Sequence, residues 1–241
     1  MKILVVNDDS INSPGIALLA KAASEFGEVT VVAPANQCSA MSQKISIHDA
    51  MKVEKVEDFP APVKAAYKVG GTPADCVKVA LHYILEEKPD YVFSGINDGY
   101  NVGYDIAYSG TLGAAFEAVM NGIPAMAFSS TMNEALHIAE ANLVSVIKEL
   151  IEAGQARGEV WNVNFPAGKP NELKGILRDR KIAPIQFYSE DYLQIKNEDG
   201  TVSLKAVGTP LTSCDNVPAG TDVEAVITGY ISIGKVKSTV L

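Results

Sequence analysis

The sequence has 241 residues, of which 47% are hydrophobic and 20% charged, and this composition excludes a disordered, fibrous or membrane-spanning protein. Twenty lysines and arginines against 29 acidic residues leave a formal charge of −9, which argues against binding to duplex nucleic acid or to an anionic membrane. The sequence has three widely spaced cysteines without a CxxC pair, and its N-terminal apolar run is too short for a signal peptide. Both observations favour a cytoplasmic protein.

The N-terminal segment predicts a β-α-β unit. Residues 3–6 form a short apolar run that is typical of a strand buried on both faces of a sheet, and residues 29–33 form a second one. Between them, Ser13 and Pro14 predict the N-cap and the first residue of a helix that reaches about Phe26. A unit of this kind has a right-handed crossover, which favours a parallel sheet.

The alternation of helices and strands continues along the chain. Thr72 and Pro73 predict the start of a helix that ends near Leu85. Strands are expected at residues 91–93, 125–129 and 160–165, and helices at residues 111–120 and 133–153. We therefore expect residues 1–165 to form an α/β catalytic core with a doubly wound, Rossmann-like and mostly parallel sheet.

The pattern changes after Pro166. Short strand-like pieces at residues 176–178, 192–195 and 202–206 are separated by turn signals, and they contain too few apolar residues for a core of their own. We expect residues 166–241 to form a β-rich extension and oligomerisation arm that belongs to the same structural unit.

Ligands of open parallel sheets bind beyond the carboxyl ends of the strands, so the loops that follow the predicted strands are the first candidates for a site. In the first loop, Asp8 and Asp9 leave a buried strand together. Such carboxylates are suitable ligands for Mg²⁺ or Mn²⁺, which can bridge to a substrate phosphate. The alternative is an Asx turn or a cap for the helix that begins at Pro14.

Two further loops contain polar residues. The loop at residues 34–40 places Ser39, whose hydroxyl could reach a metal or a phosphate, beside Cys38, for which the sequence offers no partner base. The loop at residues 94–111 contains Asn97 and Asn101 and ends in the turn of Ser109, Gly110 and Thr111. That turn enters a helix and could bind an anion through backbone N–H groups, or Thr111 could be an ordinary N-cap.

Several other chemistries lack their motifs. The sequence contains no dinucleotide fingerprint, P-loop or GxSxG elbow, and the spacing of His48, His82 and His137 does not suit a zinc site.

Together, these loops resemble the SurE family of survival proteins, which are metal-dependent nucleoside monophosphate phosphatases. The segments that carry the resemblance are ILVVNDDSINSPGI (3–16), VVAPANQCSA (31–40), GGTPADCVKVAL (70–81), SGINDGYNVGYDIAYSGTLGAAFEA (94–118), NVNFP (162–166) and GTDVEAVITGYISI (220–233).

The resemblance implies a site and a reaction. One divalent ion, Mg²⁺ or Mn²⁺, would be bound by Asp8, Asp9, Ser39 and Asn97, and the substrate phosphate by Asn101, Ser109, Gly110 and Thr111. A metal-activated water would attack a nucleoside monophosphate in line, with 3′-nucleotides and short polyphosphate as further substrates. Whether Asp8 is a base, a nucleophile or only a ligand stays open. The resemblance also implies a homodimer with exchanged C-terminal segments, or a homotetramer.

One departure from the family pattern concerns the metal loop. Ser10 stands where the family usually has glycine, which reduces the backbone freedom of the loop, and serine can replace glycine there if φ is negative. The departure leaves a second function open, that of a nucleotide-binding regulatory protein with little catalytic activity. A metal-dependent glycosyltransferase is a third alternative, suggested only by the aspartate pair and the fold.

Overall fold

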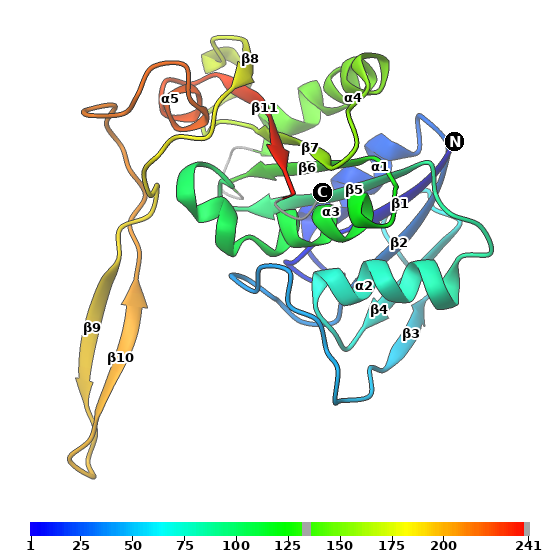
Figure 1. Cartoon of the computed structure of the whole chain (residues 1–241), viewed down its shortest axis with the longest axis horizontal. Coiled ribbons are helices and arrows are strands. Elements are labelled where there is room, and N and C mark those ends of the chain that lie inside the picture. The colour runs from blue at the N-terminus through cyan, green and yellow to red at the C-terminus, as the bar shows by residue number, and fades with distance from the viewer. Residues whose placement is uncertain (132–135, 239–241) are drawn as a thin grey trace.

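A nine-stranded, mostly parallel sheet organises the chain in the computed structural model, which describes residues 1–131 and 136–238 (Figure 1). In their spatial order the strands are β3 (Val53–Val56), β4 (Ala65–Val69), β2 (Glu28–Pro34), β1 (Lys2–Val6), β5 (Tyr91–Asp98), β6 (Ala125–Ser130), β7 (Glu159–Asn164), β11 (Ile231–Lys237) and β8 (Ile176–Arg180). The six strands from β4 to β7 in this order are parallel neighbours, while β3 runs antiparallel to β4 and β11 runs antiparallel to β7.

Helices cover both faces of this sheet. Ile3 and Val5 of β1 pack on the side of α1 (Pro14–Ala23) and α4 (Leu136–Ala153). Leu4 and Val6 face the side of α2 (Pro73–Val79) and α3 (Gly110–Met120). This alternation of side chains confirms the doubly wound α/β fold, with a strand buried on both faces at its centre. The remaining helical segments are η1 (Ala80–Ile84, a π-helix), η2 (Gly103–Tyr108) and η3 (Pro170–Glu172), both 3-10 helices, and α5 (Asp222–Ile227).

Most of the expected elements are present, with a few differences. The expected helix from Pro73 to Leu85 changes at Ala80 into a π-helix, and the helix expected to reach Phe26 ends at Ala23. The expected start of the long helix at Asn133 lies outside the described residues. Strands β3, β4 and β11 were not predicted from the sequence. Strand β3 is a four-residue edge strand with two charged residues, so it has no apolar run to reveal it.

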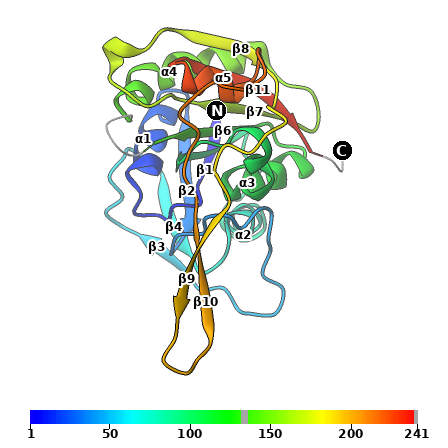
Figure 2. The same ribbon diagram turned by 90° about the vertical axis from the view of Figure 1, so that its left-hand side faces the viewer.

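The C-terminal region contributes to two different structures. Strands β8 and β11 complete the main sheet, whereas β9 (Asp191–Lys196) and β10 (Val202–Val207) form a separate antiparallel hairpin. The hairpin projects away from the body of the protein (Figure 2), and every one of its strand residues is exposed. The described part of the chain contains no helix with the length and apolar character needed to cross a membrane.

Candidate functional site

A cleft of about 360 Å³ lies at the carboxyl ends of β1 and β5, where ligands of this fold class bind. Five of the eight site residues predicted from the sequence line it, namely Asp8, Ser39, Asn97, Asn101 and Ser109. Of the other three, Asp9 directly follows Asp8 in the chain, and Gly110 and Thr111 are the two residues after Ser109. The fold therefore brings together residues from three separate loops.

Asp8 is the most buried carboxylate of the cleft, with 3% of its surface exposed. Burial, and then the charge of Asp9, raise the pKa of Asp8 to about 7, while the hydrogen bonds from Thr111 act in the opposite direction. Gly110 makes room for this carboxylate, because a Cβ built on Gly110 would lie 2.9 Å from Asp8 Oδ2. A side chain at residue 110 would therefore displace Asp8.

Asp9 is half-buried and is held from two sides. Its Oδ2 accepts a 2.7 Å hydrogen bond from the Asp98 N–H, and burial raises its pKa. Gln37 Nε2 lies 3.4 Å from Asp9 Oδ1 and 3.1 Å from Ser39 Oγ, so it connects the first and second loops. Gln37 was not predicted as a site residue, although it lies within the segment that resembles the family.

The loop after the two aspartates has an unusual backbone. Ser10 has a φ of +80°, so the condition of a negative φ, under which serine could replace glycine without strain, is not met. The turn is stabilised from within, because Asn7 Nδ2 donates a 2.8 Å hydrogen bond to the Ser10 carbonyl and the Ile11 N–H donates to the Pro34 carbonyl. These contacts compensate for a conformation that costs a residue with a Cβ about 1–2 kcal/mol.

Asn97 lies near the end of β5 and presents one amide atom to the cleft. Its Nδ2 donates a 2.7 Å hydrogen bond to the Gly99 carbonyl. The Oδ1 atom is then left to accept or to coordinate.

Asn101 is held by the carboxyl end of β7. Asn164 bonds both polar groups of the Asn101 backbone: its Oδ1 accepts the N–H at 2.9 Å, and its Nδ2 donates to the carbonyl at 3.1 Å. Asn162 Nδ2 donates to the same carbonyl at 2.8 Å, and the Asn101 side chain donates to Ser129 Oγ. These buried contacts fix the position of Asn101 in the cleft wall.

The start of α3 differs in one detail from the sequence prediction. Ser109 is the N-cap, because its Oγ accepts the Leu112 N–H at 3.1 Å, so the reading of Thr111 as an N-cap is wrong. Thr111 is the second residue of the helix, and its Oγ1 donates a 2.7 Å hydrogen bond to Asp8 Oδ1. The helix begins one residue earlier than expected because Ser109 satisfies its first turn.

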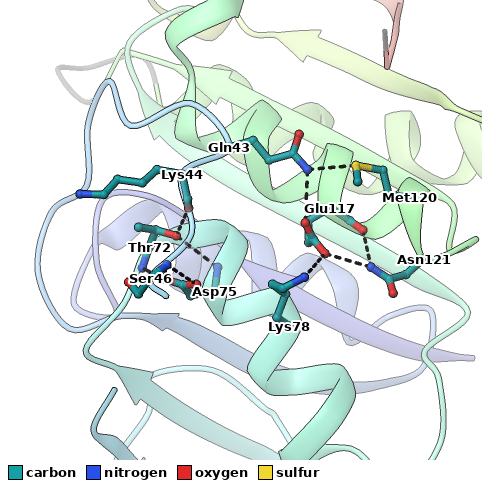
Figure 3. A network of polar contacts seen from close by, with 9 residues as sticks. All are labelled: Gln43, Lys44, Ser46, Thr72, Asp75, Lys78, Glu117, Met120 and Asn121. Carbon is teal, nitrogen blue, oxygen red and sulfur yellow. Dashed lines mark hydrogen bonds and ion pairs between the residues drawn. The ribbon is translucent and has the colours of Figure 1, made fainter. Parts of the chain in front are cut away.

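The loop that carries Ser39 is tied to α2 and α3 by a polar network (Figure 3). Asp75 accepts hydrogen bonds from the backbone and the hydroxyl of Ser46. Glu117, a buried carboxylate of α3, accepts from Gln43 Nε2 at 3.2 Å and forms a 3.1 Å ion pair with Lys78. The loop after β2 is therefore held at several points beyond Ser39.

Some cleft residues were not expected from the sequence. Tyr100, Tyr108 and Tyr188 reach the cleft, as do Asp98 and Asp105. Tyr188 comes from the region after Pro166, where no site residue was expected, and its hydroxyl accepts the Tyr100 N–H at 3.0 Å.

The donor atoms suit a hard divalent cation. Two carboxylates, a hydroxyl and an amide oxygen can be contributed by Asp8, Asp9, Ser39 and Asn97, and Mg²⁺ and Mn²⁺ prefer such oxygen ligands. Residues 1–131 and 136–238 contain no cluster of three or more His, Cys, Asp or Glu side chains that could hold a metal. Neutral oxygens must therefore complete any ligand set around the two aspartates.

Comparisons with known proteins match the chain to one family. The family described as survival protein SurE matches residues 3–183. A 5′-nucleotidase SurE of Cytophaga hutchinsonii is 39% identical over 238 residues, covering 96% of this chain and 88% of the relative. The 5′-nucleotidase SurE 1 of Thermus thermophilus is 38% identical over 236 residues, covering 97% and 90%. The crystal structure of a SurE protein from Aquifex aeolicus aligns with a TM-score of 0.82 at 34% identity, over 98% of this chain and 93% of that one.

Proposed function

Because the chain belongs to the SurE family, we propose that it is a 5′-nucleotidase, a phosphomonoesterase that releases phosphate from nucleoside monophosphates with one divalent metal ion. The observation that carries the proposal is the position of the buried Asp8 carboxylate against the first turn of α3. A metal ligand and an anion-binding helix N-terminus are thereby in direct contact.

The metal would be held by Asp8, Asp9, Ser39 and Asn97, and Mg²⁺ or Mn²⁺ matches this oxygen set. When bound, the ion neutralises phosphate charge and lowers the pKa of a coordinated water. The protein has a net charge of −9, so the ion also offsets the repulsion between the acidic cleft and an anionic substrate.

The chain's own groups would hold the phosphate. The Ser109 hydroxyl already accepts the Leu112 N–H, so its proton is available to a phosphoryl oxygen. The Gly110 N–H lies at the first position of α3, where helix N–H groups have no partner within the helix. Asn101, fixed by Asn164, borders the same cleft. These donors are positioned before the substrate binds, which favours stabilisation of charge that develops on phosphoryl oxygens.

Asp8 would act as a metal ligand. The raised pKa of its carboxyl belongs to the metal-free protein, because a bound cation favours the ionised form. Thr111 would act through Asp8, because its hydroxyl is bonded to that carboxylate. The proposal includes 3′-nucleotides and short polyphosphate as further substrates.

Ser10 is the residue that would favour a regulatory protein with little catalytic activity. Ser10 takes a positive φ, the region that a glycine favours, so the substitution does not force a different backbone path on the metal loop. We therefore favour the enzyme. The deciding measurement is phosphate release from adenosine 5′-monophosphate with added Mg²⁺ or Mn²⁺, compared with an EDTA control. Equal release in EDTA would refute the metal requirement, and no release with either ion would refute the proposed function.

We also propose that the chain assembles in the cytoplasm as a homodimer or homotetramer through the β9–β10 hairpin. Two-stranded hairpins are marginally stable alone in water, and this one exposes apolar side chains, including Tyr192, Leu193 and Leu204. Light scattering at micromolar concentration should give at least a dimer, and Leu204→Lys should shift it towards the monomer. A monomeric parent protein would refute this assembly.

A further inference from the structure

The turn that would bind the phosphate begins at the end of a short 3-10 helix. Helix η2 ends at Tyr108, and Ser109 and Gly110 follow it directly. The last carbonyl groups of a helix have no donor within that helix, and the hydrogen bonds of a 3-10 helix have poorer geometry than those of an α-helix. The end of η2 therefore needs donors from another part of the chain if the turn is to keep its position.

Ser42, in the loop after β2, supplies two such donors. Its N–H donates a 2.9 Å hydrogen bond to the Tyr108 carbonyl, and its hydroxyl donates a 2.8 Å hydrogen bond to the Ala107 carbonyl. These two carbonyls belong to the residues that come directly before Ser109. Ser42 thereby holds the backbone at the start of the phosphate-binding turn.

The turn is not packed against a solid core on every side. A hollow of about 460 Å³ is lined by Ser42, Ala107 and Ser109, among other residues, and Ser109 also lines the cleft. Atoms beside a hollow have fewer packing contacts than atoms of a close-packed core. The hydrogen bonds from Ser42 therefore contribute a larger share of the forces that fix this turn.

Ser42 is itself held against α3. A Cβ built on Gly113 would lie 2.1 Å from the Ser42 carbonyl oxygen, so the loop lies directly on the helix backbone there. Gln43 donates a hydrogen bond to Glu117, one turn further along α3 (Figure 3). These contacts keep Ser42 at a φ of +50°, a conformation that strains a residue with a Cβ. Backbone strain of this kind is concentrated at functional sites.

The same segment also reaches the candidate metal ligands. The Cys38 N–H donates a 2.7 Å hydrogen bond to the Asp8 carbonyl, and Ser39 lines the cleft. Ser42 follows Ser39 by three residues. One short stretch of chain therefore connects the residues that would bind the metal with the turn that would bind the phosphate.

We propose that Ser42 is a positioning residue for the nucleotidase reaction, whose hydroxyl fixes the phosphate-binding turn relative to the metal loop. Its hydrogen bonds go to the backbone before Ser109, so it acts on the phosphate through that turn. Phosphate binding then depends on the hydroxyl, and metal binding does not. The inference rests on the proposed function, because Ser109 and Gly110 must bind the phosphate.

The test removes the hydroxyl in two ways that affect stability differently. Ser42→Ala loses the hydrogen bond to Ala107 and keeps a Cβ at the strained φ, so its melting temperature should fall. Ser42→Gly loses the same hydrogen bond but relieves the strain, so it should melt at a higher temperature than Ser42→Ala. Ser24→Ala is the matched control. The Ser24 hydroxyl also donates to a backbone carbonyl, that of Lys21 at 2.7 Å, at the end of α1 and on the edge of the sheet opposite the cleft.

Three quantities are measured for each protein: the binding of inorganic phosphate to the Mn²⁺-loaded protein by calorimetry, the binding of Mn²⁺ alone, and the melting temperature. KM for adenosine 5′-monophosphate is measured alongside. We expect both Ser42 variants to weaken phosphate binding by about three- to tenfold, the scale of one hydrogen bond, and to raise KM by a similar factor. Their affinity for Mn²⁺ should equal that of the parent protein, and Ser24→Ala should match the parent in both titrations.

A merely structural role would make phosphate binding follow the melting temperature. Parent-like binding by Ser42→Gly together with weak binding by Ser42→Ala would therefore overturn the proposal. Parent-like phosphate binding in both variants, an equal loss of Mn²⁺ affinity, or a parent protein that binds no phosphate would overturn it too. If the parent releases no phosphate from adenosine 5′-monophosphate, the proposed function fails, and the phosphate titration still decides the role of Ser42.

Discussion

Thr111 Oγ1 donates a 2.7 Å hydrogen bond to Asp8 Oδ1, and both residues are buried. The Thr111 N–H also bonds this carboxylate, and both contacts lower the pKa of Asp8 against the stronger effect of burial. The first turn of α3 therefore stabilises the ionised form of a carboxylate that its surroundings would otherwise keep protonated.

Removal of this hydroxyl should change the pH dependence of turnover. In Thr111→Val the pKa of Asp8 should rise, so the acidic limb of the kcat/KM profile should move to higher pH. A hydrogen bond to a charged group contributes about 1.5–3 kcal/mol, so we expect turnover at pH 6 to fall by about tenfold or more. Thr111→Ser keeps the hydroxyl and should resemble the parent. Superimposable pH profiles for the parent and Thr111→Val would contradict this role.

Asp8 should also make the stability of the metal-free protein depend on pH. Its pKa is raised from 3.8 to about 7, so the folded state binds a proton that the unfolded state has released. The stability that this proton contributes is fully present below pH 4 and is lost as the pH rises through 7, by up to about 4 kcal/mol. A divalent ion binds the ionised form, so its stabilising effect should grow over the same range.

The measurement for this prediction is the melting temperature between pH 5 and pH 8, in EDTA and in Mn²⁺. Asp8→Asn is the control, because asparagine cannot titrate. In this variant most of the difference in melting temperature between pH 5 and pH 8 in EDTA should disappear. A parent protein whose EDTA curve parallels that of Asp8→Asn would contradict the assignment.

Ser10→Gly should stabilise the protein. The φ of +80° strains serine but not glycine, so the substitution should relieve about 1–2 kcal/mol of backbone strain in the folded state. This gain exceeds the cost of about 0.4–1 kcal/mol that arises because glycine gives the unfolded chain more conformational entropy. Thermal unfolding should show a rise of about 1–4 °C for a chain of this size. Ser145→Gly, at an exposed position of α4, should instead lower the melting temperature. A lower melting temperature for Ser10→Gly would show that the serine side chain is needed in the turn.

Asn164→Leu should disturb substrate binding from outside the cleft. It leaves the N–H of Asn101 without its acceptor and the carbonyl with one donor fewer, and a buried unsatisfied group costs about 1–3 kcal/mol. We expect a higher KM and weaker inhibition by phosphate, together with lower stability. Asn162→Leu removes a single donor to the same carbonyl and should have a smaller effect. Equal effects of the two substitutions would argue against a special role for the two hydrogen bonds between the Asn164 side chain and the Asn101 backbone.

The parts of the site that the sequence predicted follow from local rules. Asp8 and Asn97 could be placed together because the carboxyl ends of parallel strands β1 and β5 meet at one edge of the sheet. Ser13 and Pro14 predicted the start of α1, and the structure confirms Ser13 as its N-cap. The positive φ of Ser10 could not be predicted from the residue type alone. It depends on contacts of the folded chain, such as the hydrogen bond from the Asn7 side chain to the Ser10 carbonyl.

The parts that the sequence did not predict depend on contacts between distant segments. Tyr188 meets Tyr100 across 88 positions of the chain, and Asn164 meets Asn101 across 63. Residues 183–188 have no periodic pattern, because their packing on Gly103 and Tyr104 is irregular. Strand β11 was hidden for a similar reason: Gly234 and two lysines interrupt its apolar character, and it is recognised as a strand only through its pairing with β7 and β8.

The hairpin is inserted between β8 and β11, which are neighbours in the main sheet. A protease that cuts the exposed turn at residues 197–201 would therefore produce two fragments, each still anchored by its own strand to the same body. The cut would break the chain, but the two fragments would stay together in the folded protein. They would come apart only under denaturing conditions. Digestion followed in parallel by native and denaturing electrophoresis would distinguish this from loss of an independent domain.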